Sequence, residues 1–247
     1  LVGVPYELAV GSDLSMIVGT STAGVLRHRE AGNVNFRVAG ALAAGSVTGA
    51  IIGDLVQDVV LGVTARSDFT LTMHLLFMLL LMLAAYLTLR PVSEPGSTPL
   101  LARAPGVPRM AVEPGNGDGS LSIPALVLLG LFIGVLTGMM GIGGGVLLVP
   151  ILLALVGLGE RSAAGTSLAV VFLSAVVGTL KKGMSPLGKV SLPVTLALLA
   201  SGVAGVQLGV ALGRRMPGKR FRQYYVVVLL AALLVIGYDF TLELVGR

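Results

Sequence analysis

Long apolar runs alternate with short polar gaps along this chain, a pattern typical of a protein that crosses a membrane several times. A membrane-spanning helix needs about 20 mostly apolar residues. Four runs lie between charged residues and come close to that length, and two weaker runs are interrupted by Asp13 and Arg37. The predicted spans are Leu8–Leu26, Phe36–Gly53, Thr70–Leu89, Ser162–Leu180, Val190–Gly213 and Gln223–Tyr238.

The most informative stretch is Leu121–Gly159, in which 39 consecutive residues carry no charge. As one helix it would be about 58 Å long, nearly twice the thickness of the bilayer core. Gly141–Gly145 places four glycines in five positions, and Pro150 follows. Because both residue types disfavour a helix interior, we predict a glycine-broken helix here. Broken backbone at membrane depth is tolerated only where it is buried in protein or lines a cavity.

The basic residues indicate how this stretch lies in the membrane. If it crosses once, Lys and Arg divide 10 against 7 between the two sides. If it is re-entrant or crosses twice, they divide 12 against 5. The tendency of basic residues to stay on the cytoplasmic side favours the second arrangement.

The two halves of the chain resemble each other. Leu1–Leu14 aligns with Leu155–Leu168 at six identical positions, and Gly24 aligns with Gly178. We therefore predict a first repeat at 1–90, a Pro/Gly-rich linker at 91–120 and a second repeat at 121–247. The favoured arrangement makes the repeats inverted, as in many secondary transporters. Only the second repeat begins with a broken helix, so we expect the first to lack its first helix through N-terminal truncation.

Composition narrows the class of protein. Hydrophobic residues make up 55% of the chain and charged residues only 12%, with a mean hydropathy of +0.94. These values exclude an ordinary soluble domain and a disordered chain. The basic residues that give a net charge of +5 lie between the apolar runs, which indicates membrane orientation and no nucleic-acid partner. With no cysteine and two histidines, we expect no enzyme, no cofactor and no metal site.

The broken helix is also the candidate binding site for a small anion. Its resumption near Val146 would expose backbone N–H groups and the positive end of a helix dipole. Glycine at these positions lets an oxyanion approach the backbone closely. We expect the substrate-binding residues to be Gly141, Gly143, Gly144, Gly145, Thr166, Ser167 and the repeat-related Ser12. The alternative is a packing contact in which the hydroxyls bond to their own helices.

Asp13 is the coupling candidate, for a proton or for a cation that travels with the substrate. A carboxylate inside a membrane is costly and indicates function by default. Asp13 also lies near the start of its helix, where an acidic residue simply complements the helix dipole. Both interpretations remain open at this point.

Other patterns have structural interpretations. Glycines at every fourth position predict helix packing, in Gly45, Gly49 and Gly53 and again in Gly205, Gly209 and Gly213. We expect Asp54 and Asp58 at a solvated helix end, and Tyr224, Tyr225 and Tyr238 in an aromatic belt. Lipid phosphates are the expected partners of Arg214, Arg215, Lys219, Arg220 and Arg222.

The motifs Gly141–Pro150 and Ala164–Leu168 together resemble the paired signature of TauE/SafE-type permeases, the sulfite exporter family. Ala9–Leu14 and His28–Asn35 are similar to that family's first-repeat motifs. Ser12-Asp13 replaces the usual Thr-Ser, and Asn35 replaces the usual Asp. The first-repeat glycine motif is absent.

The resemblance implies an inner-membrane, multi-pass permease of two helical repeats that moves sulfite, sulfoacetate or other sulfonates. We therefore expect an all-α membrane protein that works as a secondary transporter by alternating access, without ATP hydrolysis by this chain. Its expected partners are the anion and the lipid bilayer, and the oligomeric state is left open. The alternative functions are a non-transporting membrane scaffold and an anion channel.

Overall fold

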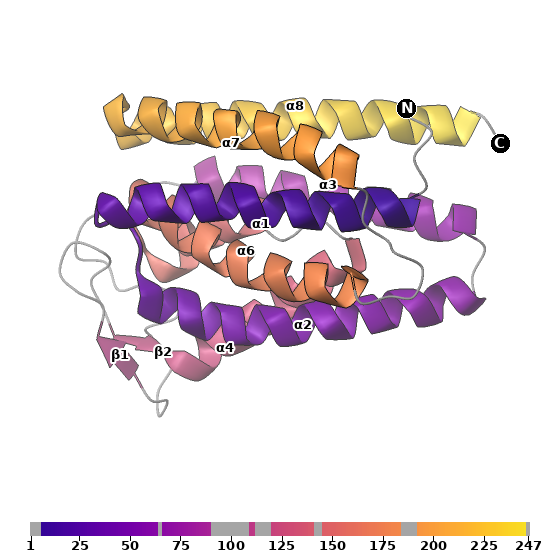
Figure 1. Cartoon of the computed structure of the whole chain (residues 1–247), viewed down its shortest axis with the longest axis horizontal. Helices are drawn as coiled ribbons and strands as arrows, with labels where there is room; N and C mark the ends of the chain where they lie inside the picture. Colours follow the sequence, from indigo (N-terminus) through magenta and orange to yellow (C-terminus); the bar gives the residue numbers. More distant parts are fainter. Residues whose placement is uncertain are drawn as a thin grey trace.

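The computed structural model describes residues 6–63, 66–89, 109–111, 120–140, 145–183 and 192–245. Almost all of them are helical, which confirms an all-α membrane protein (Figure 1). The helices are α1 (Tyr6–Glu30), α2 (Phe36–Val63), α3 (Arg66–Leu89), α4 (Ile123–Met140), α5 (Gly145–Ile151), the π-helix η2 (Leu152–Val156), α6 (Glu160–Gly183), α7 (Leu192–Arg215) and α8 (Gly218–Val245).

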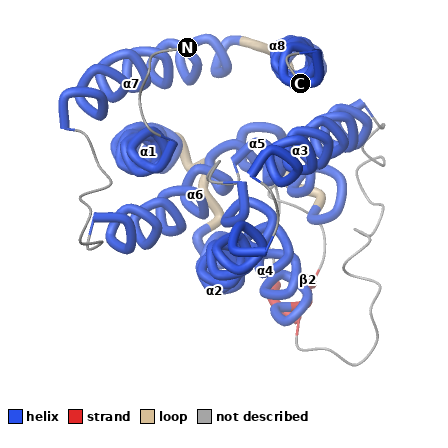
Figure 2. The backbone as a smooth tube through the Cα atoms, turned by 90° about the vertical axis from the view of Figure 1, so that its right-hand side faces the viewer, coloured by secondary structure: helices blue, strands red, loops and turns tan. Residues whose placement is uncertain are grey.

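Five helices are long and apolar enough to cross a membrane, within the part of the chain that the structure describes. The predicted spans in α2, α3, α6 and α8 lie within them, and α7 contains Val190–Gly213 from Leu192 onward, with 190–191 outside the described residues. The sixth predicted span, Leu8–Leu26, is also helical within α1, but α1 is not among the five. Its sequence carries Glu7, Asp13 and Arg27, which lower its hydropathy. Instead of facing lipid all round, α1 lies between α6 and α7 (Figure 2).

The helix directions follow from the contacts between glycines and side chains. Leu14 of α1 meets Gly178 of α6, and Leu168 of α6 meets Gly24 of α1, so α1 and α6 are antiparallel. Three hydrogen bonds join α6 to α2 and the residue before it, and the residue numbers rise together on both sides. They are Asn35 with Thr166, Ser46 with Ser174, and Asp54 with Lys181, so α2 and α6 are parallel.

The uncharged stretch Leu121–Gly159 is divided into two helices at the position that the glycines of Gly141–Gly145 predict. α4 ends at Met140 and α5 begins at Gly145. α4 is parallel to α2, whereas α5 leads through the short 157–159 connection into α6 and runs back beside it. Both ends of the stretch therefore lie at the same end of the bundle. This is the arrangement that the distribution of Lys and Arg favours.

A small antiparallel hairpin precedes α4. β1 (Arg109–Ala111) pairs with β2 (Ser120–Ser122), with Met110 opposite Leu121. β1 lies inside the 91–120 segment that the sequence predicts to be a linker, and β2 overlaps its last residue.

Glycines hold α2 and α4 together at backbone distance. A methyl group at Gly45, Gly49 or Gly53 would overlap the backbone of α4. The reverse holds for α4, because methyl groups at Gly130, Gly134 and Gly138 would overlap backbone atoms of Leu42, Ser46 and Ala50. The packing interpretation of the α2 glycine row is therefore confirmed.

The matching row in α7 behaves differently. A methyl group at Gly205, Gly209 or Gly213 would meet nothing within 4 Å among the described residues. No residue of 196–213 in α7 is buried, whereas about half of Phe36–Gln57 in α2 is. The expected packing role of the α7 row has no partner helix in this part of the chain.

The α2–α4 contact predicts a strong effect of Gly49→Ile. The new side chain must displace α4 backbone, and overpacking of this kind typically costs 1–3 kcal/mol. We expect the Tm in detergent to fall by about 3–10 °C. Gly40→Ile, on the same helix and facing open space, is the matched control and should leave the Tm within about 1 °C of the parent. Equal Tm values for the two variants would contradict the packing.

Candidate functional site

The start of α5 lies at the middle of the membrane span of α6. A methyl group at Gly145, the first residue of α5, would approach Val171 Cγ2 to 3.2 Å. Val171 is at the midpoint of the candidate span Glu160–Lys181. The other glycines predicted to bind substrate, Gly141, Gly143 and Gly144, lie outside the described residues.

One side chain from another helix replaces a hydrogen bond that α5 cannot make. In an α-helix the Val146 carbonyl accepts from the N–H of residue 150, but residue 150 is proline and has no N–H. The Tyr225 hydroxyl of α8 donates to the Val146 oxygen instead, at 2.8 Å. The aromatic-belt interpretation of Tyr225 is therefore wrong: it is half-buried and fixes the first turn of α5 to α8.

The other end of the segment closes with π-helical geometry. η2 continues α5, and Gly157 follows in the left-handed conformation at φ 76°. The N–H of Gly157 donates to the Leu152 carbonyl, and so does the N–H of Leu158, at 3.1 Å. Glycine suits this left-handed position at a helix end.

Thr166 and Ser167 have structural partners. The fully buried Thr166 hydroxyl accepts from the Asn35 backbone N–H at 3.0 Å, and the Asn35 carboxamide oxygen accepts from the Val38 N–H at 3.1 Å. Thr166 thus supports the turn that begins α2. Ser167 donates to the Ala164 carbonyl of its own helix at 2.8 Å.

Ser12 and Asp13 lie far from these hydroxyls. Ser12 is fully buried and Asp13 is half-buried, both near the start of α1. Because α1 and α6 are antiparallel, about 14 residues, or about 20 Å, separate the level of Ser12 from that of Thr166. The structure therefore does not bring Ser12, Thr166 and Ser167 together at one place.

Asp54 is not at a solvated helix end. It is 9% exposed and forms an ion pair with Lys181, which joins α2 to α6. α1 and α7 are joined at the opposite end of the bundle, where the Arg27 guanidinium donates to the Gln207 side-chain oxygen at 2.9 Å. The side chain of Asp58 lies outside the described part of the chain.

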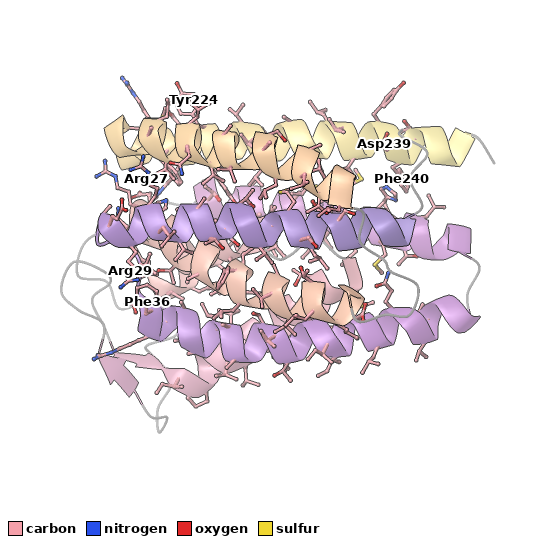
Figure 3. The ribbon with its side chains drawn as sticks, viewed as in Figure 1. Arg27, Arg29, Phe36, Tyr224, Asp239 and Phe240 are labelled. Carbon is pink, nitrogen blue, oxygen red and sulfur yellow. The ribbon has the colours of Figure 1, made fainter. Side chains whose placement is uncertain are left out.

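The end of the bundle that carries Arg27 is rich in basic residues. Figure 3 labels Arg27 and Arg29 at one end and Asp239 at the other. Arg222, which the sequence assigns to lipid phosphates, forms an ion pair with Glu160 at 2.8 Å between α8 and α6. That prediction is therefore wrong for Arg222.

A hydroxyl pair near the start of α5 is not evident from the sequence. Ser46 of α2 and Ser174 of α6 are hydrogen-bonded at 2.7 Å, and Ser174 lies about one turn beyond Val171. The only signal in the sequence is the place of Ser46 beside Gly45 in the glycine row. The pair therefore puts polar groups near mid-depth.

These features define a polytopic helical membrane protein in which one helix, α5, begins at mid-depth. The family model described as "Sulfite exporter TauE/SafE" matches residues 1–236, and the chain belongs to this family. It is 32% identical over 117 residues to the "Probable membrane transporter protein YunE" of Bacillus subtilis (strain 168). That alignment covers 47% of this chain and 41% of YunE, less than half of either. No solved structure matches.

Two neighbouring hydroxyls provide a matched test of the Thr166 contact. Thr166→Val leaves the Asn35 N–H without its acceptor, at a cost of about 1–2 kcal/mol. Ser167→Ala removes only a bond within its own helix and should be nearly neutral. We expect the Tm in detergent to fall by about 2–6 °C for Thr166→Val and by under about 1 °C for Ser167→Ala. A larger loss in Ser167→Ala would show that the hydrogen bonds are assigned wrongly.

Proposed function

We propose that this protein is a secondary transporter that moves a small anion by alternating access. The observation that carries the proposal is the start of α5 at the midpoint of the α6 span. A helix that begins inside a membrane presents backbone N–H groups and a positive dipole end, and this favours an anion there. No ATP hydrolysis by this chain is needed for such a mechanism.

The proposed substrate site comprises Gly141, Gly143, Gly144 and Gly145. Glycine there allows an oxyanion to approach the backbone without a Cβ in the way. Ser167 lies one turn before Val171 on α6, so it is the predicted hydroxyl nearest to this site in depth. We propose sulfite or a sulfonate as the substrate, because the family is described by sulfite export.

Two reciprocal contacts support an inverted repeat, as alternating access requires. The sequence alignment exchanges Leu14 with Leu168 and Gly24 with Gly178, and the structure pairs Leu14 with Gly178 and Leu168 with Gly24. α2 packs on α6 as α7 packs on α1. Among the described residues, α2 also has a glycine-packed partner, α4, whereas the corresponding glycines of α7 meet nothing within 4 Å.

The distribution of basic residues supports an orientation. The end that carries Arg27, Arg29 and Arg222 is rich in basic residues, and because such residues tend to stay in the cytoplasm, this supports a cytoplasmic position for that end. In this proposal the protein lies in the cytoplasmic membrane. The half-buried Asp13 lies towards the opposite side, where we propose that it binds the coupling ion.

The test is sulfite flux into proteoliposomes that hold the full gene product. We expect saturable flux that responds to an imposed ion gradient. Gly143→Leu, which places a bulky side chain at the proposed site, should lower the flux at least about tenfold. Gly62→Leu, in α2 and facing open space, is the control and should retain the parental flux.

Other outcomes would contradict the proposal in distinct ways. Flux that does not saturate would indicate an anion channel. An absence of flux for sulfite and for sulfonates, in vesicles that hold folded protein, would favour a membrane scaffold. Equal flux in Gly143→Leu and Gly62→Leu would remove the glycine break from the substrate pathway.

A further inference from the structure

Three helices meet at Gly24. A side chain there would overlap Leu168 of α6 and touch Val206 of α7, so this position of α1 faces both helices. α6 is antiparallel to α1, whereas α7 is parallel to it, because Gly19 meets Leu199 and Gly24 meets Val206.

Three helical turns from this junction lies a set of polar residues. A step of 11 residues covers just over three whole turns, so it returns to nearly the same helix face about 16 Å away. From Gly24 it leads to Asp13 of α1, and from Val206 to Thr195 of α7. Because α6 is antiparallel to α1, the same step runs forward along α6, from Leu168 to Thr179. Asp13, Thr179 and Thr195 therefore share one level and one junction.

α1 stays in contact with α6 and with α7 on the way towards this level. Leu14 meets Gly178 between α1 and α6, one residue from Asp13 and from Thr179. Met16 meets Gly202 between α1 and α7. α1 is therefore packed between α6 and α7 on the way from Gly24 towards the polar set.

The two threonine hydroxyls differ from those of other threonines in α1 and α3. The Thr179 and Thr195 Oγ1 atoms are buried and have no hydrogen-bond partner in the structure as described, and Thr195 as a whole is 9% exposed. Thr20, Thr22 and Thr88 instead donate to carbonyls of the preceding turn. Because a buried hydroxyl without a partner is unfavourable, both oxygens are available to a ligand.

The polar set exists at one end of the bundle only. The repeat alignment relates Asp13 to Ser167, Thr179 to Val25 and Thr195 to Ala39. The equivalent junction therefore has no carboxylate and two apolar residues. Helix packing alone accommodates apolar residues at these places, so packing does not explain the polar ones.

We propose that Asp13, Thr179 and Thr195 bind a monovalent cation, Na⁺, which is the coupling ion of the transporter. Oxygen ligands suit hard cations, and one carboxylate balances one positive charge. The nearby Lys181 ammonium is held by Asp54 and does not neutralise Asp13. The coupling role of this site rests on the proposed function as a transporter, whereas the binding of Na⁺ does not.

The first experiment measures thermal unfolding of the full gene product in detergent without sulfite, in NaCl and in KCl at equal ionic strength. We expect Na⁺ to raise the Tm in a saturable way, because a ligand that binds only the folded state stabilises it. Equal Tm values in the two salts would overturn the proposal, whether or not vesicles transport sulfite. A loss of sulfite flux with the Na⁺ effect intact would overturn only the transport proposal.

The second experiment assigns the ligands. Asp13→Asn should abolish the Na⁺-dependent rise in Tm, and Thr195→Val should increase the Na⁺ concentration for half the effect about tenfold or more. Thr195→Ser keeps the hydroxyl and should restore the parental response. Thr48→Val is the control, because the exposed Thr48 hydroxyl bonds to the Ala44 carbonyl of its own helix. A parental Na⁺ response in both Asp13→Asn and Thr195→Val would overturn the proposal.

Discussion

A helix that begins inside a membrane must have its free backbone groups satisfied by something other than lipid, and this structure depends on how that is done for α5. Pro150 removes the N–H that the Val146 carbonyl would accept, and Tyr225 of α8 supplies a hydroxyl donor in its place. The same bond fixes the position of α5 relative to α8. At the other end, Gly157 adopts a left-handed conformation and closes the π-helical turn. The backbone N–H groups at the start of α5 are those that the proposed substrate would contact.

The second constraint is the close approach of α2 and α4. Lipid offers no hydrophobic gain for helix association, so packing distance is decisive. Glycines on both helices remove the side chains that would separate the two backbones. This contact holds α4 parallel to α2 as far as the level of Gly53, and α5 then begins at mid-depth, beside Val171. Glycine thus has two roles in the same stretch, as a packing surface in α4 and as a helix break after it.

Most of the fold could be predicted from the sequence, because apolar run length and glycine spacing are local signals. They predict the helices and the position of the break, and the distribution of Lys and Arg favours the return of Leu121–Gly159 to one side. The weak hydropathy of α1 is explained by its place between α6 and α7, which no local pattern reveals.

The site was harder to predict, because it depends on which helix faces which. The sequence repeat relates Ser12 to Thr166, the neighbour of Ser167, and so predicts that their hydroxyls lie in one site. Antiparallel packing of α1 and α6 instead puts Ser12 at the other end of the bundle from Thr166. The partner of Thr166 is a backbone N–H distant in sequence, and Asp54 has its cation on α6. Thr179 and Thr195 carry no sequence signal at all, since only the register of three helices places them beside Asp13.

The central claim, that the start of α5 lines a water-filled anion site, is tested most directly by chemical labelling. The chain has no cysteine, so Val146→Cys provides a single thiol in the first turn of α5. Leu128→Cys, on the exposed face of α4, serves as the control. The account predicts that a membrane-impermeant maleimide labels Cys at 146 but not at 128, and that methanesulfonate slows the labelling at 146. An unlabelled thiol at 146, or labelling unchanged by methanesulfonate and by sulfoacetate, would contradict it.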